Sequence, residues 1–170
     1  MADISAIFFI LLIIGVAYPA LLTAWWLLFP STVERARVRL ERTPWHSFWL
    51  GGVVLAMIII PILILLALPF GPAKFLGWIL IALTLTFSGL GAAGLAARLG
   101  ERVSRLSTIS GLGAFVRGAI ILELASFFPV MGWFIFFPLA TVTTLGAAAF
   151  ALLRWLPKSA PAVEPASVQA

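Results

Sequence analysis

Long apolar stretches separated by short polar connections dominate the order of residues along the chain. The stretches at residues 4–29, 48–70 and 75–97 are each long enough to cross a hydrocarbon core of about 30 Å as a helix. A further stretch, residues 114–155, is too long for one crossing and must break. We place the break at Pro129 and Gly132, because proline removes a main-chain donor and glycine permits a turn.

This break creates a C-terminal hairpin whose first segment, residues 112–128, is short. Its helical rise of about 26 Å either just spans a bilayer or enters it as a re-entrant arm. The pattern therefore predicts an all-α polytopic transmembrane helical bundle with four full spans plus this short or re-entrant fifth segment. Pro138 then falls in the first turns of the last helix, where a proline costs least.

The connections carry signals of their own. Pro19 is the expected bend in the first run, which is longer than a straight crossing needs. Residues 31–34, Ser-Thr-Val-Glu, match a capping box that opens a short helix ending near Thr43. Residues 71–74 predict a tight turn, so the runs on either side are antiparallel neighbours. Residues 1–156 are expected to form one transmembrane domain, and residues 157–170 a disordered cytoplasmic tail.

Composition and charge support this reading and set an orientation. The chain is 63% hydrophobic and 10% charged, whereas soluble domains carry about 25% charged residues. Lys and Arg accumulate in cytoplasmic loops. With the N-terminus outside, Lys74 is the outside residue, and the inside residues are Arg35, Arg37, Arg39, Arg42, Arg98, Arg102, Arg105, Arg154 and Lys158. We expect a multi-pass protein of a bacterial inner membrane with a cytoplasmic C-terminus, and no nucleic-acid partner.

Glu123 needs an explanation, because a carboxylate within a membrane segment is costly unless it is protonated, paired or hydrated. Thr141 on the facing helix is its best-placed hydroxyl partner. Arg117 has poor geometry for a pair and is expected to extend to the cytoplasmic interface. One interpretation makes Glu123 a group that handles protons or ions. The other makes it a packing residue that is protonated, hydrogen-bonded or in contact with another subunit. Packing is favoured, since no second acid or histidine lies at comparable depth.

Two predicted helices carry small residues at a spacing of four. One face holds Gly89, Ala93 and Ala97, and the other holds Thr143, Ala147 and Ala151. Residues 89–94 match the letters of the dinucleotide fingerprint, but they lie inside a span rather than after a strand. We therefore interpret both faces as surfaces for close helix packing.

The arginines of the short helix offer a possible lipid contact. Arg35, Arg37, Arg39 and Arg42 could bind anionic head groups or an acidic partner surface, or could simply be the charge that orients the chain. The sequence has no cysteine and one histidine, so no metal or other cofactor is expected. No catalytic constellation is visible, and we expect no enzyme activity.

The C-terminal half resembles a known family. The similarity lies in residues 91–100 (GAAGLAARLG), Arg117-Gly118, residues 127–133 (FFPVMGW) and residues 145–148 (LGAA). Across about residues 75–155 this resembles the membrane region of bactofilin-like, polymer-forming bacterial membrane proteins, although the repetitive β-helical domain of that family has no counterpart in this sequence. The resemblance implies an inner-membrane protein of an anchoring or scaffolding kind, with no catalytic residues.

These observations predict a non-enzymatic structural or assembly component. It would associate through its small-residue faces with itself or with a larger membrane complex, and membrane lipids would be its other partners. The alternative is a small transporter or channel subunit that uses the broken hairpin and Glu123. A polar cavity reaching Glu123 would favour transport, and a dry, packed Glu123 would favour assembly.

Overall fold

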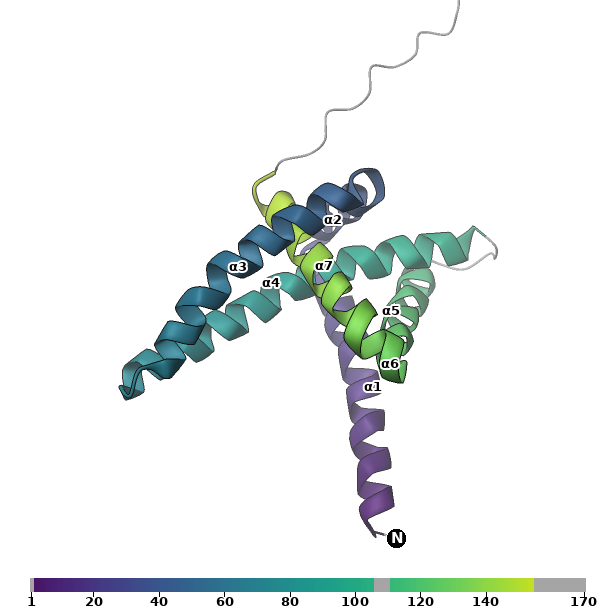
Figure 1. Cartoon of the computed structure of the whole chain (residues 1–170). Coiled ribbons are helices and arrows are strands. Elements are labelled where there is room, and N and C mark those ends of the chain that lie inside the picture. Colours follow the sequence, from purple (N-terminus) through teal and green to yellow (C-terminus); the bar gives the residue numbers. More distant parts are fainter. Residues whose placement is uncertain (1, 106–110, 155–170) are drawn as a thin grey trace, which may run out of the picture.

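The computed structural model describes residues 2–105 and 111–154, and all regular structure in these ranges is helical (Figure 1). The predicted tail at residues 157–170 lies outside the described residues. In chain order the elements are α1 (Ala2–Leu28), α2 (Pro30–Arg42), α3 (Pro44–Ala67), α4 (Gly71–Ser104), α5 (Gly111–Phe127), α6 (Pro129–Met131), the π-helical turn η1 (Gly132–Phe136) and α7 (Phe137–Leu152).

Several of these helices are long and apolar enough to cross a membrane. Three qualify alone: Pro44–Ala67, Gly71–Ser104 and Pro129–Leu152. A fourth candidate joins Gly15–Leu28 to Pro30–Arg42, two helices bent by 108°. The predicted class is confirmed to this extent: the described chain is all-helical and has several helices long and apolar enough to cross a membrane. The tight hairpin is confirmed, but its turn lies at residues 68–70; residues 71–74, which were predicted to form it, are the first turn of α4.

The chain turns sharply between α1 and α2, and here the predicted capping box was wrong. Helix α1 continues through Pro19, where the predicted bend stays a prediction, and a bend of 108° lies at the junction with Pro30. No side chain caps the start of α2; Pro30 occupies its first turn, where a missing N–H costs least. Glu34 of the predicted capping box instead pairs with Arg37, its Oε1 lying 2.6 Å from Nη2.

The C-terminal hairpin breaks where predicted, although Gly132 has a different role. Helix α5 ends at Phe127, Phe128 is extended, and a new helix begins at Pro129. Gly132 has right-handed helical angles (φ −65°, ψ −50°) and therefore does not form the turn. A Cβ at this position would lie 2.6 Å from the main-chain oxygen of Ala125, so glycine is needed for close contact with α5.

Pro138 lies in the first turn of α7, as predicted, although the helical path already begins at Pro129 and runs on through η1. The π-helical turn η1 immediately precedes it, and the N–H of Phe137 donates to the carbonyl of Gly132. A proline ring collides with the preceding turn of a regular α-helix. The wider π turn accommodates that ring while the helix continues.

Helix α4 is the central helix, and its glycines allow three other helices to touch its backbone. A Cβ at Gly91 would lie 1.9 Å from the Thr144 oxygen on α7, and one at Gly94 would lie 2.8 Å from Ala36 on α2. At Gly100 the nearest atom, 2.3 Å away, is the main-chain oxygen of Ala114 on α5. Such close approach at small residues is how membrane helices gain packing energy without a hydrophobic driving force.

The packed region lies at one end of the molecule, where α2 crosses α4 and α7; we call it the crossing region. From there α3 and α4 leave together as one arm, while α1 and the α5–α7 hairpin extend in other directions (Figure 1). Many large apolar side chains on the arms are exposed, including Met57 and Phe134 at 69% and 77%. In a bilayer these side chains face lipid. The buried clusters comprise Leu22, Val33, Ala36, Leu40, Ala92, Ala93, Ala96, Phe115, Ala119, Leu122, Ala147 and Ala151.

Candidate functional site

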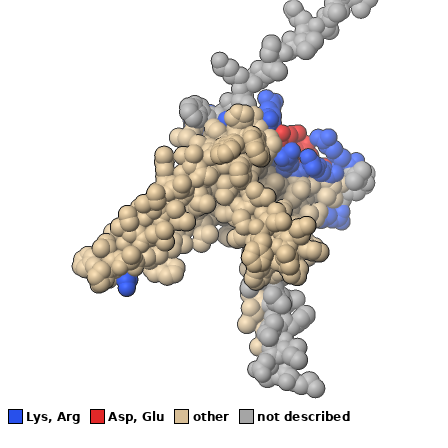
Figure 2. Space-filling model, viewed as in Figure 1, with Lys and Arg blue, Asp and Glu red and all other residues tan. Residues whose placement is uncertain are grey.

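Positive charge gathers at the end of the molecule that carries α2. In Figure 2 the visible Lys and Arg side chains cluster there, beside a small acidic group, apart from one at the tip of the α3–α4 arm. Lys74 lies in the first turn of α4, which begins at that tip. On this face the Lys and Arg side chains therefore lie at opposite ends of a mostly uncharged surface (Figure 2).

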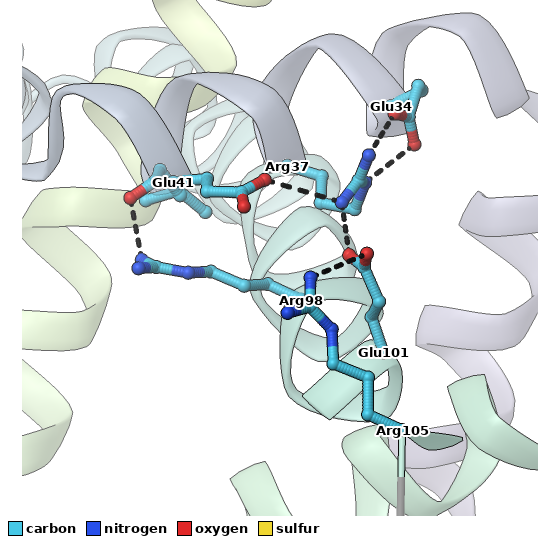
Figure 3. Close-up of polar contacts among 7 residues, drawn as sticks. Glu34, Arg37, Glu41, Arg98, Glu101 and Arg105 are labelled. Carbon is cyan, nitrogen blue, oxygen red and sulfur yellow. Dashed lines mark hydrogen bonds and ion pairs between the residues drawn. The ribbon is translucent and has the colours of Figure 1, made fainter. Parts of the chain in front are cut away.

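Arg37 is the centre of an ion-pair network that joins α2 to α4 (Figure 3). Its Nε and Nη2 donate to Glu34 at 2.9 and 2.6 Å, and its Nη1 contacts Glu101 on α4 as well as Glu41 at 3.5 Å. Arg105 also reaches Glu101, at 3.4 Å. Hydrogen bonding to Glu34 raises the pKa of Arg37 above its usual range, partly opposed by burial and reinforced by the other two carboxylates.

Two other arginines donate to main-chain carbonyls near helix C-termini. The Nε of Arg35 donates to the oxygen of Ala151 on α7 at 3.0 Å, and its Nη2 donates to Thr32 at 3.1 Å. The Nη1 of Arg98 on α4 donates to the oxygen of Leu40 on α2 at 2.6 Å. The last carbonyls of a helix lack intrahelical donors and carry partial negative charge, so these cations stabilise both ends.

Arg39 packs against α7 rather than pointing to solvent. Its guanidinium carbon lies 3.8 Å from the centre of the Phe150 ring, a cation–π arrangement. Burial lowers the pKa of Arg39. Of the four arginines predicted to meet lipid head groups, Arg35, Arg37 and Arg39 thus hold the crossing region together, and Arg42 is exposed. The spacing of Glu34, Arg37 and Glu41 could have indicated the local pairs, whereas the contact with Glu101 depends on the fold.

Glu123 on α5 is buried, with 6% of its surface exposed. Its Oε1 is fully enclosed and has no hydrogen-bond partner among the described residues. No hydrogen bond joins it to Thr141, its predicted partner; instead α1 lies beside it, with a Cβ position on Gly15 only 3.9 Å from Oε1. Arg117 is exposed and does not pair with Glu123, in line with the expected geometry.

A cavity of about 360 Å³ lies beside this carboxylate. Its lining is Tyr18, Glu123, Ser126, Phe127, Trp133 and Phe137. The Ser126 hydroxyl already donates to the main-chain oxygen of Leu122 at 3.0 Å. The cavity therefore has aromatic walls and one unpaired acid. It is neither the polar cavity that would favour transport nor the dry, packed environment that would favour assembly. No pattern in the sequence indicated that Tyr18 would lie here.

The predicted packing faces are used largely inside the chain. Ala93 and Ala147 are fully buried and Ala151 is 2% exposed. Ala93 packs where α1, α2, α4 and α5 meet, and the other two alanines pack against α2. Gly89, Ala97 and Thr143 are half-buried; Gly89 faces Trp25, and the Thr143 hydroxyl donates to Leu139 at 2.6 Å.

A different small-residue surface is open. A groove of about 540 Å³ runs between α1 and α5. Its lining combines small residues of α1 with larger apolar ones, namely Gly15, Val16, Pro19, Ala20, Thr23, Ala24 and Leu27 from α1 and Val116 and Ile120 from α5. Ala20 and Ala24 are exposed. The Thr23 hydroxyl donates to the oxygen of Pro19 at 2.7 Å, so the groove presents no unpaired hydroxyl. Sequence reasoning singled out no such face on α1.

Comparison with protein-family models, with curated proteins and with solved structures gives no match. The resemblance to bactofilin-like membrane proteins therefore stays a prediction. Within residues 2–105 and 111–154, no group of three or more acidic or histidine side chains gathers in a way that could hold a metal ion.

Proposed function

We propose that this protein is a non-enzymatic integral membrane component that assembles with itself or with other chains of a larger membrane complex. The groove between α1 and α5 carries this proposal, because it is an open surface with small residues on its α1 side, beside a bundle in which Ala93, Ala147 and Ala151 are already packed. In lipid, helices associate through close packing at Gly, Ala, Ser and Thr rather than through a hydrophobic driving force. Ala20 and Ala24 offer that kind of surface to a partner helix.

The topology we propose has four full spans, with α5 as the short fifth segment, in a bacterial inner membrane. Helix α5 has 17 residues, at the lower limit of what a crossing needs. The N-terminus lies outside and the arginine-rich crossing region lies at the cytoplasmic face, where Lys and Arg accumulate. Arg42, exposed on α2, is the residue of that helix best placed to contact anionic head groups.

The alternative, a small transporter or channel subunit, depends on Glu123 and the broken hairpin. Ion passage requires a sequence of polar or charged groups along a path. The mostly aromatic lining of the Glu123 cavity offers one carboxylate, and its Ser126 hydroxyl is already donated to the main chain, which supports assembly over transport.

The groove is tested by filling it. Ala20→Leu/Ala24→Leu should release the protein from its assembly, seen as a smaller particle mass after extraction into lipid nanodiscs. Ala56→Leu/Ala82→Leu makes the same exchange at exposed positions on α3 and α4 and should leave the mass unchanged. A wild-type protein that is monomeric at every concentration, or a filled groove without effect on the mass, would overturn the proposal.

A further inference from the structure

We propose that the cavity beside Glu123 binds a lipophilic organic cation, an ammonium group carrying a small apolar or aromatic body. This inference goes beyond assembly, because it assigns a ligand site to the α1, α5 and η1 region. It is carried by two observations that point to the same ligand: an enclosed carboxylate without a partner, and the aromatic walls around it.

The carboxylate needs a cation that the described chain does not supply. Glu123 is 6% exposed, and its Oε1 has no donor within the described residues. Arg117, on the same helix, is exposed and does not reach it. An unpaired acid in such a place is costly, and a positive charge bound in the adjoining cavity lowers that cost.

The walls specify what kind of cation fits. Phe127, Trp133 and Phe137 line the cavity together with the ring of Tyr18. Aromatic rings attract cations through the negative potential of their faces, and they recognise quaternary ammonium groups in particular. An inorganic cation is disfavoured because it requires several oxygen ligands. Here Glu123 is the single carboxylate in the lining, and the Ser126 hydroxyl is donated to the main chain.

The size of the cavity limits the ligand further. A volume of about 360 Å³ lies at the small end of the range of about 300 to 1,000 Å³ typical of small-molecule sites. The site therefore suits one aryl or alkyl ammonium compound rather than a complete two-chain lipid. Trp133, 65% exposed at the hairpin tip, lies where such a ligand can enter from the bilayer.

The test compares two probes of nearly equal shape, benzyltrimethylammonium and its uncharged carbon analogue neopentylbenzene. Saturable shifts in the melting temperature of the full-length protein are measured in maltoside detergent, which contains no ammonium group. The cation should give a saturable shift and the carbon analogue should not. Glu123→Gln should weaken cation binding by about tenfold or more, because it removes the paired charge. Leu124→Ala, at an exposed neighbouring position, should leave binding unchanged.

A second pair of variants tests the opposite wall, should Glu123→Gln fail to fold. Trp133→Leu should weaken binding of the cation, and Trp133→Phe should retain most of it, since only the latter keeps a ring face. Equal binding of both probes, unaltered affinity in Glu123→Gln, or equal effects of the two Trp133 variants would each overturn the proposal. Absence of any saturable shift with wild-type protein would do so too.

Discussion

Arg35 on α2 donates a hydrogen bond from its Nε to the main-chain oxygen of Ala151 on α7, over 3.0 Å. The same guanidinium donates to Thr32, so one side chain joins the C-terminal end of the last helix to the first turn of α2. Arg98 makes a comparable bond from α4 to the end of α2. Helix α2 is therefore fixed to both α4 and α7 by charged donors.

Replacing Arg35 by lysine should weaken this connection. A lysine ammonium lacks the planar fork that donates to Ala151 and Thr32 together. We expect Arg35→Lys to lower the free energy of unfolding by about 1 to 2 kcal/mol, measured by dodecyl sulfate titration in mixed micelles with circular dichroism. Arg42→Lys, an exposed exchange on the same helix, should stay within about 0.5 kcal/mol of wild type. Equal losses in the two variants would mean that the Arg35 bonds do not stabilise the bundle.

Adjacent glycines on α3 should respond in opposite ways to the same exchange. A Cβ at Gly51 would lie 1.8 Å from the main-chain oxygen of Val142 on α7, whereas nothing lies within 4 Å of one at Gly52. Gly51→Ala should destabilise the protein by about 1 to 3 kcal/mol through overpacking. Gly52→Ala should be neutral or stabilise it by up to about 1 kcal/mol, because alanine favours the helix. The same titration measures both, and a shared sign would contradict the α3–α7 crossing.

The contact between Arg37 and Glu101 should show a small, salt-sensitive coupling. A double-mutant cycle with Arg37→Gln and Glu101→Gln should give about 0.5 to 1 kcal/mol, kept low by solvent because the Glu101 side chain is 41% exposed. The coupling should fall with added salt. A parallel cycle on Glu101 and Arg105, whose side chain is 70% exposed, should give a coupling near zero. A larger value for the second pair would contradict the network.

The contribution of Arg37 should not depend on pH in the ordinary working range. Its pKa is raised in the folded protein, chiefly by Glu34. A basic group whose pKa is higher in the folded than in the unfolded protein stabilises the fold fully at any pH below the unfolded-state pKa. This stabilisation is lost only as the pH rises through the folded-state pKa. The difference in unfolding free energy between wild type and Arg37→Gln at about pH 8 should therefore persist at about pH 10. A difference that vanished between these values would be inconsistent with this assignment.

Cysteine labelling tests the topology directly, because the sequence contains no cysteine. Single variants Arg42→Cys and Arg102→Cys should be protected from an impermeant maleimide in intact cells and react after permeabilisation. Lys74→Cys should react in intact cells. All three positions are exposed, so a difference in labelling reports on the side of the membrane. Labelling of Arg42→Cys and Arg102→Cys from opposite sides would exclude the proposed arrangement.

Local signals in the sequence predicted much of the fold. The hairpin between α3 and α4 and the restart of the helix at Pro129 follow from proline and glycine, which act on the backbone where they stand. The role of Gly132 was not predictable in this way. Its requirement comes from the nearby Ala125 oxygen on α5, a contact that exists only once the two helices have packed.

The candidate sites were less accessible to sequence reasoning for the same physical reason. Hydropathy shows that Glu123 lies in an apolar segment, but it does not say which helix packs beside it. The neighbour is α1, at Gly15, and not the predicted hydroxyl of Thr141. The charge pattern places the arginines together. Their individual partners, such as Ala151 for Arg35, depend on the sharp turn that lays α2 across the bundle.

The divergence of the arms from the crossing region gives the protein unequal widths at its two ends (Figure 1). Embedded in a bilayer, such a wedge takes up more area in one monolayer than in the other, and the surrounding lipids must adjust to the mismatch. Curved regions of membrane already carry that inequality. Copies of this protein should therefore concentrate in such regions, where their shape adds the least deformation.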